Sequence, residues 1–160
     1  MSLKILHLIS QRPDSTGSGV YLQEILSAAH QAGHENFLVA AVNDEQIPEL
    51  PGLGRDQCRF VDFLPKTSNH PEIVGMSDIM PYASRRFRDL SEEEIEQYLD
   101  KFRVPIVEMV ESFHFDLIHS HHLWLLSSLT RRLFPKLPMV TSCHGSDLRQ
   151  MNQCPHLLPM

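Results

Sequence analysis

Apolar and polar residues are arranged along the chain in two patterns, which together predict an α/β fold. Five short, mostly apolar runs end in polar or turn-forming residues, as strands do when a parallel sheet is buried on both faces. In several of the intervening segments, apolar residues recur every three or four positions, which is the period of an amphipathic helix. The expected strands are residues 4–9, 37–42, 59–64, 116–120 and 139–143.

The two longer helical segments have recognisable ends. Apolar residues recur at spacings of three and four from Gly19, and Gly33 ends this helix because a left-handed helix terminus favours glycine. Ser91 and Glu94 have the spacing of a capping box, which begins a second helix whose apolar face continues to residue 113. Pro105 interrupts that face, so a kink or two abutting helices are expected.

Two shorter helices complete the pattern. One begins at residue 125 or 126 and is closed by Pro135, and the other begins near Leu148 with Ser146 or Asp147 as its cap. Residues 65–89 have no regular period, and such stretches in compact domains are usually mobile or functional. The order of strands and helices predicts an open parallel α/β sheet.

Composition narrows the class of protein. The 160 residues fit one domain with a buried core, so residues 1–160 are expected to form a single domain. A net charge of -6 disfavours nucleic acid as a partner, because nonspecific binding to it depends on Lys and Arg. The three cysteines have unrelated spacings, as in a reducing compartment, and no apolar run is long enough to span a bilayer. A cytoplasmic protein is expected.

Candidate chemistry follows the strands, because the ligand crevice of an open parallel sheet forms at their carboxyl ends. The first candidate is the loop with Gly17, Ser18 and Gly19, where glycines let the backbone approach a ligand and a helix N-terminus offers free N–H groups. Leu22 stands where a dinucleotide fingerprint needs its third small residue, so a nicotinamide site is not expected. The loop could equally be a flexible turn with a helix cap.

The second candidate is a group of histidines at the end of the fourth strand. His119 and His121 share one face of that strand, and His122 follows them. Histidine pairs can bind zinc, but the spaced Cys and His pairs of structural zinc sites are absent, so no metal is expected. Packed histidines are the alternative interpretation. The residues that could complete a metal shell are His114, His144 and His156.

The third candidate is His144, which ends the last strand. An imidazole there projects into the crevice and can bond a hydroxyl or a developing charge, although a structural role at the strand end is also open. A hydrolase is not expected, because the chain has no G-x-S-x-G elbow. Cys143 precedes His144 and points to the opposite face, which disfavours thiol catalysis.

Three stretches in this order resemble the retaining glycosyltransferases of family 4. The opening strand, the Gly17 and Gly19 loop and the helix VYLQEILSAAHQAGHE are similar to the family's strand, glycine loop and helix ending in "L…GH". DLIHSHHLWLLSSL is similar to its D-h-h-H-x-H strand and following helix, where h is apolar, and PMVTSCHGSDL is similar to its P-h-V-x-T-x-H-G-x-D stretch. The family's glycines are often adjacent, whereas here Ser18 separates them.

The resemblance implies a GT-B architecture, in which two Rossmann-like domains with helices on both faces of the sheet meet across a cleft. Residues 1–160 would be the N-terminal, acceptor-side domain. Such hexosyltransferases move a sugar from a nucleotide-sugar donor to a sugar or lipid-linked acceptor, retain the anomeric configuration and use no metal or other cofactor. A lipid acceptor would imply peripheral contact with the inner face of the membrane. Because the sequence lacks the C-terminal donor domain, this half alone is expected to fold but not to catalyse.

The resemblance also implies roles for individual residues. His144 would be the catalytic residue that contacts the donor sugar near the reacting carbon. Gly17, Ser18 and Gly19 would approach the donor diphosphate. The residues expected to line the cleft are His119, His121, His122 and Asp147.

A standalone Rossmann-like binding or regulatory module is the alternative function. A reading frame that ends near Met160 would favour this module, and one that continues with a second Rossmann pattern would favour the glycosyltransferase. The sequence leaves open the donor sugar and nucleotide, the acceptor, the oligomeric state and the role of residues 65–89.

Overall fold

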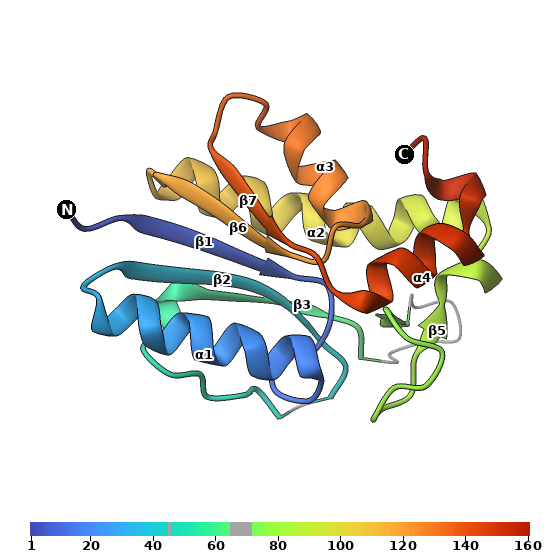
Figure 1. Cartoon of the computed structure of the whole chain (residues 1–160), viewed down its shortest axis with the longest axis horizontal. Coiled ribbons are helices and arrows are strands. Elements are labelled where there is room, and N and C mark those ends of the chain that lie inside the picture. The colour runs from blue at the N-terminus through green and yellow to red at the C-terminus, as the bar shows by residue number, and fades with distance from the viewer. Residues whose placement is uncertain (45, 65–71) are drawn as a thin grey trace.

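The computed structural model describes residues 1–44, 46–64 and 72–160, and a five-stranded sheet lies at its centre (Figure 1). Every pair of neighbouring strands in this sheet is parallel. In spatial order, the strands are β3 (Cys58–Asp62), β2 (Glu35–Val42), β1 (Lys4–Ile9), β6 (Leu117–His121) and β7 (Met139–Ser142). The chain leaves β1 toward β2 and returns on the other side at β6, so the carboxyl ends of β1 and β6 flank the topological switch point.

Helices cover both faces of the sheet, as Figure 1 shows. Helix α1 (Gly17–Gln31) packs on one face, where Leu22 and Leu26 lie among apolar side chains of β1 and β2. Helices α2 (Glu92–Ser112) and α3 (Leu125–Leu133) cover the other face, which contains the larger apolar core. The prediction of a Rossmann-like open parallel sheet is therefore confirmed.

Most of the predicted helix ends are also confirmed. Gly33 has a φ of 84°, the left-handed conformation expected just beyond α1. Ser91 and Glu94 form the capping box, with the Ser91 hydroxyl 3.2 Å from the Glu94 nitrogen and a Glu94 carboxylate oxygen 2.8 Å from the Ser91 nitrogen. Pro105 lies inside α2, which continues as one helix, so of the two alternatives expected, a kink or two abutting helices, the second is wrong. Phe102 and Ile106 are fully buried, and their packing maintains the helix through the proline.

Two further predictions differ from the structure. Helix α4 (Gly145–Gln153) begins at Gly145 rather than near Leu148, because the chain turns into the helix directly after β7. Part of the segment without a regular period is ordered: β4 (Val74–Gly75) and β5 (Arg85–Arg86) form a parallel pair, while residues 65–71 lie outside the described part. The short helical turns are η1 (Arg55–Gln57), η2 (Phe87–Asp89) and η3 (Pro155–Leu157).

Two predictions from composition can be compared with the structure. The three cysteines are free thiols. Among the helices of residues 1–44, 46–64 and 72–160, none combines the length and the apolar character required to cross a bilayer.

Candidate functional site

A pocket of about 350 Å³ opens at the carboxyl edge of the sheet. It lies where helices α1 and α4 begin, and the segment that follows β4 forms a further side. Residues from each of the three candidate motifs therefore meet here, together with the segment after β4, which was not a candidate. The lining residues that carry the argument are Gly17, Ser18, His122, His144 and Gly145.

The first turn of α1 forms one wall of the pocket. The Thr16 hydroxyl caps the helix by accepting the N–H of Gly19 at 3.1 Å. At Gly17 a Cβ would meet nothing within 4 Å, so the backbone at the helix start is open to a ligand. The first N–H groups of a helix have no partner within the helix and carry partial positive charge. Gly17 and Ser18 are thus placed to contact an anion.

Gly19 has a different position from the other two residues of this loop. It is buried and is absent from the residues found to line the pocket. A Cβ at Gly19 would lie 2.9 Å from the carbonyl carbon and oxygen of Pro13, a distance that side chains do not tolerate. The structure therefore indicates that glycine is required here for close packing of the helix against the loop.

A buried arginine fixes the loop that precedes α1. The guanidinium of Arg12 lies 2.8 Å from the Asp14 carboxylate and 2.6 Å from the Asp44 carboxylate. Arg12 is only 6% exposed, so these ion pairs are shielded from water on the arginine side. They connect the loop to the segment after β2 and hold the start of α1 in place.

The first turn of α4 forms the opposite wall. His144 occupies the N-cap position, and its backbone N–H donates to the Asp147 carboxylate at 2.8 Å. A Cβ at Gly145 would meet nothing within 4 Å, as at Gly17. Two helix N-termini, each beginning with a glycine that leaves open space, therefore face the same pocket.

His122 and Asp147 form a buried hydrogen-bonded pair behind this wall. Nδ1 of His122 lies 2.6 Å from one carboxylate oxygen of Asp147, and the other oxygen accepts the N–H of Leu123 at 2.9 Å. Burial alone would raise the pKa of Asp147, but hydrogen bonds from His122 and from the His144 and Leu123 N–H groups lower it. An ionised Asp147 can only accept, so Nδ1 of His122 must carry a proton. In the neutral imidazole, Nε2 then holds the lone pair and can accept a hydrogen bond.

The backbone at His122 supports a functional role for this pair. His122 has a φ of 83°, which is an uncommon conformation for a residue with a side chain. Such strained positions cluster at binding and catalytic sites, where the surrounding structure maintains them. Here the bond to Asp147 holds the ring at the rim of the pocket.

The imidazole of His144 lies beside that of His122, with ring centroids 4.7 Å apart. Its Nε2 is buried and has no hydrogen-bond partner among the described residues. Burial, followed by the nearby His122 ring, lowers the pKa of His144, although Asp147 acts in the opposite direction. A neutral ring with a free nitrogen can donate or accept a hydrogen bond from a ligand hydroxyl.

We predict that Asp147→Asn reverses the tautomer of His122 while largely preserving the fold. The amide oxygen can accept the two backbone N–H groups, and its NH2 group must then donate to Nδ1 of His122. The free energy of unfolding should fall by about 1 kcal/mol, since charge-assisted hydrogen bonds become neutral ones. Urea unfolding measures this loss, and imidazole ¹⁵N shifts report the tautomer. Asp100→Asn on the exposed face of α2 is the control, and an unchanged His122 spectrum in Asp147→Asn would contradict the assignment.

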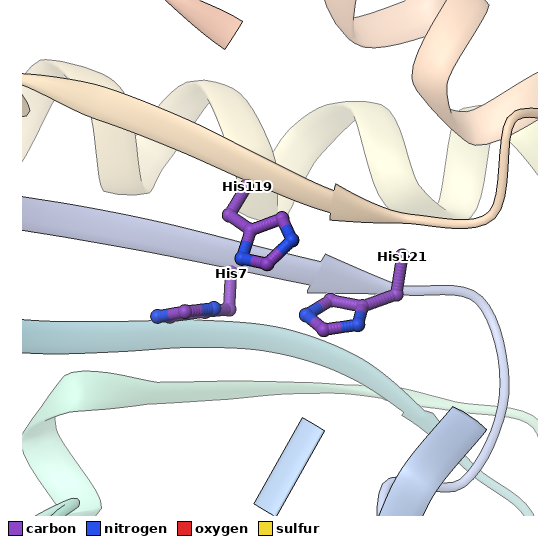
Figure 2. A group of neighbouring side chains, drawn as sticks. All are labelled: His7, His119 and His121. Carbon is purple, nitrogen blue, oxygen red and sulfur yellow. The ribbon is translucent and has the colours of Figure 1, made fainter. Parts of the chain in front are cut away.

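His119 and His121 lie outside the pocket, beneath α1. Their rings stack with centroids 4.4 Å apart, which confirms that they share one face of β6. His7 of β1 joins them, with its ring 5.3 Å from that of His119 (Figure 2). The sequence interpretation missed His7, although its position on the neighbouring strand, opposite His119 in register, was available once β1 and β6 were paired.

The segment that follows β4 contributes an apolar side to the pocket. The residues concerned fall in the part of the chain that showed no regular period, and composition alone did not assign them to a site. The backbone carbonyl of Met76 accepts from the Gln150 side chain at 3.1 Å, which attaches the segment to α4. The apolar lining residues are Met76, Ile79, Met80 and Pro81.

Comparison with known proteins identifies the family to which this chain belongs. No curated protein matches the chain in a sequence search. A family model described as Glycosyltransferase Family 4 matches residues 15–157, a stretch that contains both helix N-termini and the His122–Asp147 pair. Because this match spans most of the 160 residues, the chain belongs to glycosyltransferase family 4 and forms a glycosyltransferase domain of that family.

Proposed function

We propose that this domain is the acceptor-side half of a retaining glycosyltransferase with the GT-B architecture. The donor diphosphate would bind between the N-termini of α1 and α4, with a second domain supplying the remaining contacts to the nucleotide sugar. The observation that carries the proposal is the convergence of Gly17 and Gly145, each with open space, on one pocket.

The electrostatics of the pocket suit a diphosphate. Free N–H groups and the helix dipole favour negative charge at a helix N-terminus, and here two such ends meet. The described lining residues include neither Asp nor Glu, and the carboxylate of Asp147 behind the wall is occupied by His122 and backbone N–H groups, so no lining carboxylate offers Mg²⁺ its preferred ligands. This composition supports transfer without a metal in the pocket.

His144 is the proposed catalytic residue. Its Nε2 would bond a hydroxyl of the donor sugar close to the carbon at which the bond to the diphosphate breaks. Because its pKa is lowered, the ring is neutral near pH 7 and acts through hydrogen bonding rather than as a cation. Nε2 of His122, also buried and unpartnered among the described residues, would accept a second hydroxyl.

The apolar side of the pocket is the proposed acceptor side. Met76, Met80 and Pro81 face the two helix N-termini across the pocket, where an acceptor must approach the donor sugar. The acceptor would be a sugar or a lipid-linked sugar, and a lipid-linked acceptor would bring the enzyme to the inner face of the membrane. The domain by itself would not turn over a nucleotide sugar, because the donor would lack its second set of contacts.

Pyrophosphate binding to this chain tests the location of the diphosphate. We expect pyrophosphate to shift the amide NMR signals of Gly17 and Gly145. Gly17→Asp and Gly145→Asp should each weaken this binding by at least about 10-fold, since a carboxylate in the pocket repels the anion. Both substitutions leave the fold intact, because the positions have space and an acidic residue is favourable in the first turn of a helix.

Ala28→Asp is the matched control for charge. It adds the same charge to α1 at an exposed position far from the helix N-terminus, and we expect pyrophosphate to bind this variant as it binds the unmodified chain. If Gly17→Asp and Ala28→Asp bound pyrophosphate equally well, the diphosphate would not lie between the two helices and the proposed function would lose its main support.

A further inference from the structure

His7, His119 and His121 form a histidine triad that is separate from the pocket. Figure 2 shows the three rings close together beside β1 and β6, and one ring nitrogen from each lies within 4.8 Å of the others. The triad is absent from the residues found to line the pocket, and the ring centroids of His121 and His144 are 6.5 Å apart. The triad therefore needs an explanation of its own.

Hydrogen bonds fix the tautomer of His7. The Asn36 side-chain nitrogen donates to the Leu26 carbonyl at 3.1 Å, so its oxygen must face His7 and accept the N–H at Nε2, also at 3.1 Å. This arrangement leaves the lone pair on Nδ1, which is buried and has no hydrogen-bond partner among the described residues. Histidines that bind metals are commonly held in this way, with one nitrogen donating to an oxygen and the other free to coordinate.

His121 and His119 supply two further nitrogens. His121 is 1% exposed, and both of its ring nitrogens are buried without a hydrogen-bond partner in the described structure. Nε2 of His119 lies 2.8 Å from the Ser142 hydroxyl, which leaves its Nδ1 for another contact. Unpartnered buried nitrogens are unfavourable unless something binds them.

The protonation states suit coordination. Burial lowers the pKa of His7 to about 4 and that of His121 to about 2, and burial also lowers the pKa of His119. All three rings are therefore neutral near pH 7, which is the form in which histidine binds metals.

We propose that the histidine triad binds a borderline divalent transition metal, with Zn²⁺ as the leading candidate. Three neutral imidazoles and one further position suit Zn²⁺, and hard cations such as Mg²⁺ are disfavoured because they require oxygen ligands. Zinc–nitrogen bonds of about 2.0–2.1 Å require the nitrogens to move closer together, which rotation of the rings can provide. His119 is only partly buried, and water on that side would complete the coordination.

The sequence predicted no metal because the spaced Cys and His pairs of structural zinc sites are absent, and the completing ligands considered were His114, His144 and His156 rather than His7. The third ligand, His7, comes from another strand and is brought to β6 by the register of the sheet. The proposed site is distinct from the transfer chemistry, and its test does not depend on glycosyltransferase activity.

Metal binding can be measured directly on the chain after treatment with a chelator. We expect calorimetry to show one Zn²⁺ bound per chain, and Co²⁺ to give the visible absorption of four-coordinate cobalt. His119→Gln keeps a polar group beside Ser142 and should preserve the fold. Loss of a residue that only hydrogen-bonds to a metal ligand typically weakens metal binding by roughly 10–100-fold. Because His119 would itself be a ligand, we expect this variant to lose more Zn²⁺ affinity than that.

A double variant and NMR make the test specific. The His114→Ala, His156→Ala variant removes two exposed histidines outside the triad and should bind Zn²⁺ as the unmodified chain does. In the unmodified chain, Zn²⁺ should shift the imidazole ¹⁵N signals of His7, His119 and His121. Absence of stoichiometric Zn²⁺ binding, or binding that shifts only other histidines, would overturn the proposal and leave the pyrophosphate experiment unaffected.

Discussion

His144→Ala should lower the turnover of the intact glycosyltransferase by about 100-fold, the loss typical of removing one positioned hydrogen-bond donor from an active site. The reason is local: His144 lines the pocket and its Nε2 is buried without a partner in the described structure, so the substitution removes the hydrogen bond that we propose to the donor sugar. The substitution should leave the fold intact, because the hydrogen bond that His144 makes to Asp147 comes from its backbone N–H. Steady-state kinetics and thermal unfolding measure the two effects.

A second histidine substitution provides the control for this experiment. His114→Ala removes an exposed imidazole just before β6 and should leave both turnover and stability unchanged. If the hydrogen bond from His144 forms mainly in the transition state, when charge separates at the donor carbon, the substitution should lower kcat by a larger factor than it changes the KM for the nucleotide sugar. Normal kcat in a folded His144→Ala enzyme would remove this residue from the proposed mechanism.

Acid should destabilise the metal-free domain strongly below pH 6.5. His7 and His121 are buried with their pKa values lowered to about 4 and about 2, whereas the ordinary value is 6.5. Between these values the unfolded chain binds protons that the folded chain does not, so stability is greatest above pH 6.5 and falls as the pH falls. Each ring contributes about 2 kcal/mol of this loss between pH 7 and 5, or about 4 kcal/mol for the two.

Urea unfolding at several pH values, with a chelator present, checks this prediction. His7→Gln or His121→Gln removes one titrating ring, so the dependence of stability on pH should become shallower in either variant even if its stability at pH 7 is lower. His114→Ala, which removes an exposed histidine, should leave that dependence unchanged. A free energy of unfolding that stays constant from pH 7 to pH 5 would show that the two buried rings are not held neutral.

Local sequence signals predicted a large part of the fold. The strand-like runs, the capping box at Ser91 and Glu94, and the glycine that follows α1 all depend on residues close together in sequence, and the structure confirms them. Where a local signal conflicted with packing, packing prevailed. Pro105 does not divide α2, because buried side chains on both sides of it pack against the core.

The candidate site was predictable only in part. The positions of Gly17 and His144 at strand ends indicated that they would share one edge of the sheet, and the pocket brings them together. Gly19 has the same local context as Gly17, yet it packs against Pro13. The apolar side of the pocket was not predictable, because residues 76–81 have no regular period and are placed by contacts with α4.

By itself, the sequence determined the α/β class, the order of the elements and the family motifs, since each depends on the spacing of nearby residues. Only the tertiary structure decided which residues meet. The register of β1 against β6 placed His7 beside His119, and the turn after β7 placed Asp147 beneath His122. The physical reason is that such contacts depend on how strands pair and helices pack, and local spacing along the chain does not specify that arrangement.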